Sequence, residues 1–212
     1  MMKLRIATGL GLLLFMATMI GGPVGMSRAG DRGVTLASLA GNFASRTSGS
    51  FTLCYNESFT EAVDCASALH QEVHFKLTSV GHGARDAAGN GCGVTSVSST
   101  LTGTAVAVYA AKFPRRMNVQ RTNVSTTTSF DPTTGSGTAS FRQYREKSCS
   151  GAGFDTTGAV LAATGTQSFR VSDSGNRIET ILTSISYVPS SFTIAGSIKE
   201  TMGKATAIRQ SD

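Results

Sequence analysis

Alternation of apolar and polar residues is the main structural signal along this chain. In the segment Ser191–Met202, Phe192, Ile194, Ile198 and Met202 share one parity, and serine, threonine and lysine dominate the other. Val73, Phe75 and Leu77 alternate in the same way with polar residues. A two-residue period predicts β-strands that bury one face and expose the other.

The sequence predicts eight strands and a possible ninth, separated by turn residues. The expected strands are Asn42–Cys54, Val73–Val80, Gly91–Thr100, Ala105–Phe113, Met117–Phe130, Gly137–Lys147, Val160–Val171 and Arg177–Val188, with Phe192–Met202 as the ninth. Thr60–His70 contains several alanines and no glycine or proline, so it is expected to form one short helix.

A repeated aspartate-to-glycine phrase marks the turns between strands. It occurs at 86–90, 131–135, 155–158 and 173–176. The aspartate side chain bonds to the backbone two residues on, and the glycine adopts the left-handed conformation. We therefore expect an all-β, antiparallel up-and-down meander that closes into a barrel and so leaves no exposed edge strand. A two-sheet sandwich is the alternative.

The N-terminus has the pattern of an export signal. Lys3 and Arg5 precede an apolar run to Ile20, and Ser27 and Ala29 fit a signal-peptidase site. We expect a signal peptide at 1–29, a linker at 30–37, one barrel-like domain at 38–204 and a tail at 205–212. The mature chain would carry no membrane span and would be secreted or periplasmic. Cleavage would lower the formal net charge from +6 to about +3, which gives little reason to expect nucleic acid as a partner.

Four cysteines, Cys54, Cys65, Cys92 and Cys149, all lie beyond the cleavage site. An even number in an exported chain predicts two disulfides, and neither pair has the C-x-x-C spacing of a zinc or redox motif. Three pairings are possible. We favour Cys54–Cys65 with Cys92–Cys149.

The first strand begins with Leu39-Ala-Gly-Asn-Phe43, which resembles the Gly-x-Trp entry of lipocalin-like (calycin) barrels, with Phe43 in place of tryptophan. This resemblance implies a barrel with a ligand cavity. The turns 131–135 and 155–158, the Phe51–Cys54 strand and the export signal also resemble uncharacterised secreted bacterial β-proteins, and that resemblance implies no activity.

Two groups of residues are candidates for chemistry. His70, Glu72 and His74 would share one face of a strand, where two imidazoles and a carboxylate could bind zinc. Lys112, Arg115, Arg116 and Arg121 form a basic stretch that could attract an anion, with Arg142, Arg145 and Lys147 on a neighbouring strand. The simpler interpretation of both groups is a solvated strand face.

No nucleophile elbow, cofactor motif or paired metal motif is present in the sequence. We therefore expect no cofactor and a non-catalytic exported barrel that binds a small apolar or amphipathic ligand or a partner. The alternatives are an enzyme with a metal site or an active site in the lumen, and an integral outer-membrane barrel. The sequence leaves the oligomeric state open.

Overall fold

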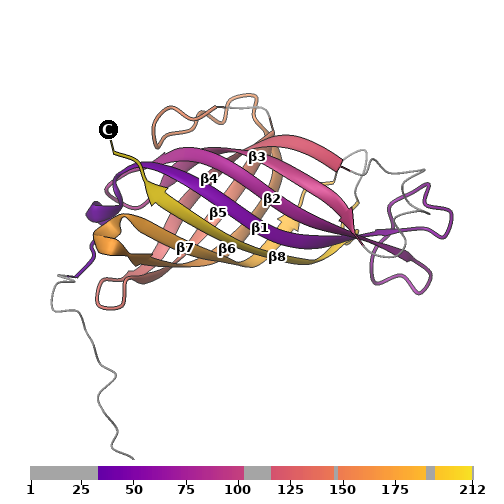
Figure 1. The fold of residues 1–212 in the computed structure, drawn as a ribbon. Coiled ribbons are helices and arrows are strands. Elements are labelled where there is room, and N and C mark those ends of the chain that lie inside the picture. Colours follow the sequence, from indigo (N-terminus) through magenta and orange to yellow (C-terminus); the bar gives the residue numbers. More distant parts are fainter. Residues whose placement is uncertain (1–32, 103–115, 146–147, 190–193, 212) are drawn as a thin grey trace, which may run out of the picture. The chain divides into compact units, whose positions relative to one another are not determined.

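The computed structural model describes residues 33–102, 116–145, 148–189 and 194–211, all within the unit Asp31–Asp212. Eight antiparallel strands close into a barrel in sequence order (Figure 1). They are β1 (Gly41–Tyr55), β2 (Gln71–Arg85), β3 (Gly91–Thr102), β4 (Arg116–Asp131), β5 (Ser136–Arg145), β6 (Val160–Ser172), β7 (Arg177–Tyr187) and β8 (Ile198–Arg209). The predicted meander barrel is confirmed, and the sandwich alternative is wrong.

The barrel has two different ends, because the chain crosses them with different connections. At one end, here called the turn end, short turns join β2 to β3, β4 to β5 and β6 to β7. At the other, the loop end, the connections are longer and include residues 56–70 and 188–197. The expected strand at 105–113 lies outside the described residues.

The turn end follows the aspartate-to-glycine pattern. The Asp131 carboxylate accepts a hydrogen bond from the Thr133 amide at 2.8 Å, and Asp86 accepts one from the Ala88 amide at 2.9 Å. Gly135 and Gly89 have φ of 66° and 78°, values that favour glycine. The turns at 86–90 and 131–135 are confirmed, and their local bonds set the hairpin register. The turn at 155–158 lies in the longer connection between β5 and β6, and Asp173 of the fourth turn lies in η2 with a φ of 53°.

The predicted helix at Thr60–His70 is wrong, because the described residues contain only the short 3-10 helices η1 (Leu36–Leu39) and η2 (Asp173–Gly175). The Asn56 side chain accepts from the Thr60 amide at 2.9 Å, and the Val63 amide donates to the Cys54 carbonyl at 3.0 Å. Such bonds compete with helical ones. The Cys54–Cys65 disulfide also ties this segment to the end of β1.

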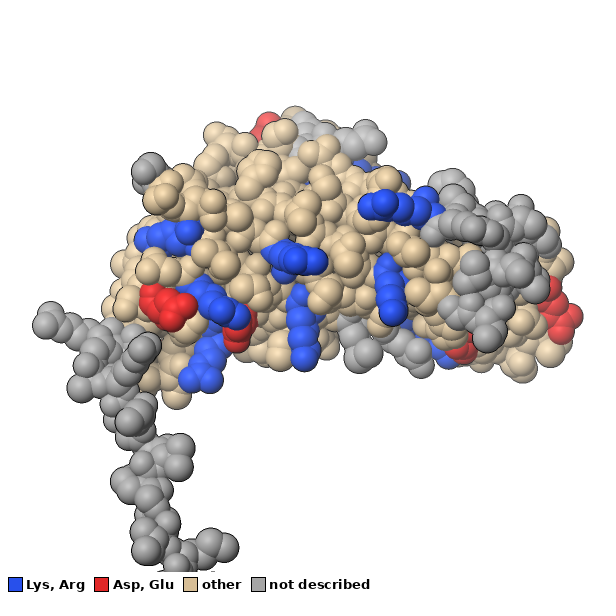
Figure 2. Space-filling view, viewed as in Figure 1, with Lys and Arg blue, Asp and Glu red and all other residues tan. Residues whose placement is uncertain are grey.

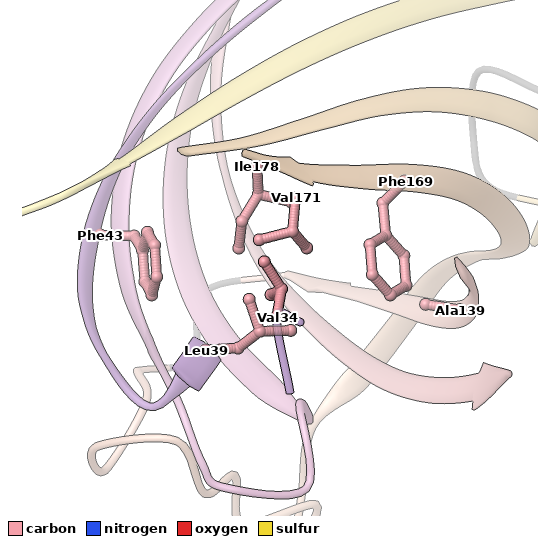
Figure 3. Close-up of a cluster of buried hydrophobic side chains, with 7 residues drawn as sticks. All are labelled: Val34, Leu39, Phe43, Ala139, Phe169, Val171 and Ile178. Atoms are coloured by element: carbon pink, nitrogen blue, oxygen red, sulfur yellow. The ribbon is translucent and has the colours of Figure 1, made fainter. Parts of the chain in front are cut away.

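A hydrophobic cluster fills the barrel at the turn end (Figure 3). Leu39 on η1 is completely buried, and Val34 packs beside it against Phe43, Phe169 and Ile178. Residues expected to form a linker therefore plug the barrel. At the far end of the chain, Arg209 pairs with Phe43 in the β1–β8 ladder, so the sheet extends beyond the expected boundary at residue 204.

A second hydrophobic cluster lies at the loop end. It is built from Leu53, Val73, Phe75 and Leu101, with Phe51 stacked on Phe75 at 5.0 Å between ring centroids. Between the two clusters the inward positions carry small and polar residues, among them Ser45, Ser79, Asn123 and Gln167. Phe141, which is buried and belongs to neither cluster, also points inward from β5, so the middle of the interior is mixed in polarity.

Both favoured disulfides are confirmed. Cys54 bonds to Cys65, and Cys92 on β3 bonds to Cys149 in the connection after β5. These bonds indicate an oxidising compartment, either extracellular or periplasmic. Among the described residues, no helix has the length and hydrophobicity of a membrane span.

Candidate functional site at the loop end

The inner faces of β4 and β5 follow from their pairing. Met117 packs in the loop-end cluster, and Ala139 is buried in the turn-end cluster, so both point into the barrel. Strand alternation then directs Arg121 inward on β4 and Arg145 inward on β5. The inward orientation of these two arginines was not predicted from the sequence.

Arg121 and Arg145 are direct partners in the β4–β5 ladder, and we call them the inner arginine pair. Side chains at directly opposed positions have Cβ atoms about 5 Å apart, and like charges there destabilise the sheet. Both residues are half-buried. The pair therefore concentrates positive charge on one part of the inner wall.

Arg145 is the more exceptional member of the pair. Its Nε atom is buried and has no hydrogen-bond partner. Burying a donor without a partner costs about 1–3 kcal/mol, and more for a charged group. Arg121 Nη1, by contrast, donates to the Gln120 carbonyl at 2.9 Å, so the Nε of Arg145 is the buried donor of the pair that lacks an acceptor.

Amide side chains lie next to the pair on the same inner wall. Asn123 and Gln143 are ladder partners one inward position further along. The Asn123 side-chain amide donates to the Thr95 hydroxyl at 2.9 Å, and this hydroxyl donates to the Arg121 carbonyl at 3.2 Å. These contacts hold the β3–β4 side of the site in place.

Exposed apolar residues flank the charges. Val119 precedes Arg121 by two residues on the same inner face, and 39% of its surface is exposed. Val160, the first residue of β6, is the ladder partner of Arg145 and is 55% exposed. An accessible apolar surface thus adjoins the inner arginine pair.

The other inward arginines on the described strands lie at the turn end, where each donates to a backbone carbonyl, although the Nε of Arg209, like that of Arg145, is buried without a partner. Arg85 donates to the Gly89 carbonyl at 2.8 Å, and burial lowers the pKa of its guanidinium. Arg209 donates to the Ser38 carbonyl and lies over the Phe43 ring, 5.4 Å from its centroid. Arg85 therefore holds the β2–β3 turn, and Arg209 fastens the segment before β1 to the barrel.

The predicted metal ligands come together on the outer face as an ion-pair network. The Glu72 carboxylate lies 3.2 Å from His70 Nε2, 3.8 Å from His74 Nε2 and 2.5 Å from Lys199 Nζ. Lys199 and His70 hold the pKa of Glu72 below its ordinary value. Within the described part of the chain, no group of three or more histidine, cysteine, aspartate or glutamate residues could hold a metal ion.

The predicted basic stretch is divided between the two faces of β4. Arg116 is exposed on the outer face, where its Nε donates to the Ser98 hydroxyl at 2.7 Å, whereas Arg121 faces inward. Lys112 and Arg115 lie outside the described residues. The odd spacing between 116 and 121 already implied this separation on a strand.

In comparisons with known proteins, no family model, curated protein or solved structure matches this chain. The eight-stranded meander barrel is consistent with the lipocalin-like resemblance and does not identify that family. Function therefore has to be argued from the site itself.

Proposed function

We propose that this protein is an exported, non-catalytic binding barrel that takes a small amphipathic anion at its loop end. The anionic group would lie on Arg145 and Arg121, and the apolar part would lie against Val119 and Val160. The observation that carries the proposal is the buried Nε of Arg145, which lacks a partner on an arginine that faces another arginine.

The chemistry of guanidinium supports an oxyanion as the ligand. Its planar set of donors matches a carboxylate or phosphate, and such charge-assisted bonds are about twice as strong as neutral ones. An anion between the two side chains would supply an acceptor for Nε and reduce the repulsion across the ladder. Any ligand that binds only the folded state also stabilises it.

The exposed valines favour an organic anion over a bare inorganic one. Val119 and Val160 offer apolar contact beside the charge, and burial of apolar surface contributes about 25 cal/mol per Å². A carboxylate with a short alkyl chain would satisfy both halves of the site. The two disulfides agree with a protein that works outside the cytoplasm, and the signal peptide at 1–29 remains part of this proposal.

The outer faces of the strands argue against an integral outer-membrane barrel. Serine, threonine, lysine and arginine are the most common residues at these positions, as at Arg46 and Ser48 of β1 and at Thr166, Ser168 and Arg170 of β6, and the exposed Val80, Ile181 and Ile208 are separate apolar positions among them. A barrel in lipid needs an apolar outer band. The outer wall here has the chemistry of a surface in water.

Decanoate is a suitable test ligand, with decanol and decyltrimethylammonium as neutral and cationic comparisons. Isothermal titration should show that decanoate binds more tightly than either. Arg145→Gln and Arg121→Gln should each raise its Kd at least about tenfold, because a hydrogen bond to a charged group is worth about 1.5–3 kcal/mol.

Arg142→Gln is the matched control, because Arg142 lies on the same strand and faces outward. It removes the same charge and should change the Kd less than twofold. Equal binding of decanoate and decanol, or an equal loss in the Arg142 variant, would contradict the proposal. Thermal unfolding of each variant without ligand checks that the fold is intact. The Arg145→Lys variant keeps the positive charge and removes the planar set of donors, so its Kd shows which of the two the ligand requires.

A further inference from the structure

Acidic and basic residues occupy different parts of the barrel. Acidic side chains are concentrated in the connections, at Asp86, Asp131, Asp155 and Asp173 and at Glu57, Glu61 and Asp64. Basic side chains lie along the strands. In Figure 2, lysine and arginine are spread across the visible wall, and most of the acidic atoms lie toward its ends. The small net charge therefore conceals a basic wall.

Four cations on the outer face of the barrel form what we call the basic wall. They are Lys204 on β8, Arg46 on β1, Lys76 on β2 and Arg116 on β4. Lys76 and Arg116 both pair with Thr100, so they lie two strands apart in one row. Lys204 pairs with Ser48, two residues from Arg46. Strand spacing places neighbouring cations on the order of 10 Å apart, about one Debye length at 0.1 M salt, so their potentials reinforce each other.

Two acidic side chains near the basic wall are each bonded to a cation. Glu72 is bonded to Lys199 at 2.5 Å, and Glu179 on the adjoining β7 is bonded to Arg177 at 2.7 Å. Arg46, Lys76 and Lys204 form no ion pair with any residue that the structure describes. Their charge is available to a partner.

Hydroxyl groups lie between the cations, together with Val80, which is the ladder partner of Arg46 and is 62% exposed. Ser48, Thr78, Ser96 and Thr100 all lie on this outer face. The described outward residues of these five strands include no aromatic side chain, because their phenylalanines and tyrosines face inward. Single-stranded nucleic acid is held by stacking on aromatic rings as well as by charge. This surface offers charge and hydrogen bonds on a continuous sheet.

We propose that the basic wall binds an acidic polysaccharide, with Arg46, Lys76, Arg116 and Lys204 contacting its carboxylate or sulfate groups and the intervening hydroxyls contacting the sugar. The cations are spread over five adjacent strands of the curved wall, which suits an extended polymer rather than a compact ligand. This surface lies on the outside of the barrel, so the interaction is separate from the amphipathic anion proposed for the inner arginine pair.

Dextran sulfate and polygalacturonate are the probes, with uncharged dextran as the comparison. The full mature chain should bind both acidic polymers and not dextran. The double variant Arg46→Ser/Arg116→Ser should raise the Kd for dextran sulfate at least tenfold. The plot of the logarithm of the dextran sulfate association constant against the logarithm of the salt concentration should become less steep by about one for each arginine removed, as it does for proteins that bind nucleic acid polyanions.

The double variant Arg142→Ser/Arg170→Ser is the matched control, because both arginines are exposed on the outer face of β5 and β6. It has the same net charge and should bind within about twofold of the unaltered protein. An equal loss in both double variants would show a general charge effect and overturn the proposal. Tighter binding of single-stranded DNA than of either polysaccharide would overturn it as well.

Arg145→Gln distinguishes the two proposals, since it should abolish tight decanoate binding and leave dextran sulfate binding unchanged. Loss of both activities in this variant would contradict a separate outer site. Unfolding midpoints of the variants, which change only exposed arginines or the half-buried Arg145, confirm that binding is measured on folded protein.

Discussion

Glu72 shows how the neighbours of a single residue determine its chemistry. Its carboxylate has two histidines and a lysine around it, and Lys199 comes from a strand more than a hundred residues away. The Lys199 ammonium group forms an ion pair with this carboxylate. The sequence brought the three predicted ligands to one face, and tertiary pairing supplied the fourth group that changed their role.

We expect Glu72→Gln to lower the free energy of unfolding at pH 7 by about 1 kcal/mol or less, as for exposed ion pairs. Lys199 and His70 lower the pKa of Glu72 from 4.5, so the folded state favours the ionised form. That stabilisation is complete above pH 4.5 and is lost as the pH falls through the lower folded-state pKa. Urea unfolding at pH 7, 5 and 3 should show the difference from the unaltered protein shrinking below about pH 4.5.

Glu179→Gln is the comparison for this prediction, because Glu179 pairs with Arg177 alone and is more exposed. It should have a smaller effect at pH 7. A difference for Glu72→Gln that stays constant or grows at pH 3 would contradict the ion-pair network.

At the scale of elements, the two disulfides close loops of very different length. Cys54 and Cys65 are separated by 11 positions, and Cys92 and Cys149 by 57. The first ties the connection after β1 to that strand. The second ties the connection after β5 to β3 across the intervening β4, and so links distant parts of the barrel wall.

Removing the longer-range disulfide should destabilise the protein more. In the chain-entropy description, loops of these lengths correspond to about 3 kcal/mol for Cys54–Cys65 and about 4 kcal/mol for Cys92–Cys149. Urea unfolding of Cys54→Ser/Cys65→Ser and Cys92→Ser/Cys149→Ser measures both. A larger loss for the local pair would show that loop length does not control the stabilisation here.

For the molecule as a whole, closure of the turn end depends on the segment before β1. Val34 and Leu39 enter the barrel and complete the cluster with Phe43, Phe169 and Ile178 (Figure 3). Gly175 also lies against this segment, since an added Cβ there would come within 3.2 Å of the Ser38 side-chain oxygen. The plug is thus part of the core.

Leu39→Ala should lower the free energy of unfolding by about 2–5 kcal/mol, because it removes a completely buried side chain. Leu69→Ala is the control, since Leu69 is 72% exposed and its loss should change stability by less than about 0.5 kcal/mol. Chemical denaturation of the two variants makes the comparison. Equal stabilities would mean that the plug does not contribute to the core.

Much of the barrel was predictable because its signals are local. A two-residue period reports one buried face, and each aspartate-to-glycine turn joins neighbouring strands, so alternation and turns together specify a meander. The favoured disulfides also fit this order. The helix expected at Thr60–His70 failed because alanine content describes only intrinsic preference, whereas side-chain caps and the Cys54–Cys65 bond act on that particular segment.

The sequence by itself therefore determined most of the strands, several turns and the even set of cysteines, since each depends on residues close together in the chain. The last strand lies at Ile198–Arg209, later than the expected Phe192–Met202. Tertiary structure decided which residues of different strands meet. Ladder register placed Arg121 opposite Arg145, brought Lys199 to Glu72 and aligned Lys76 with Arg116. Closure of the barrel turned one set of alternating residues on each strand inward and the other set outward. It therefore placed Arg121 on the inner face and Arg116 on the outer face, although both belong to one predicted basic stretch. Neither register nor closure is encoded within any single strand, so the sequence of one strand could not predict this separation.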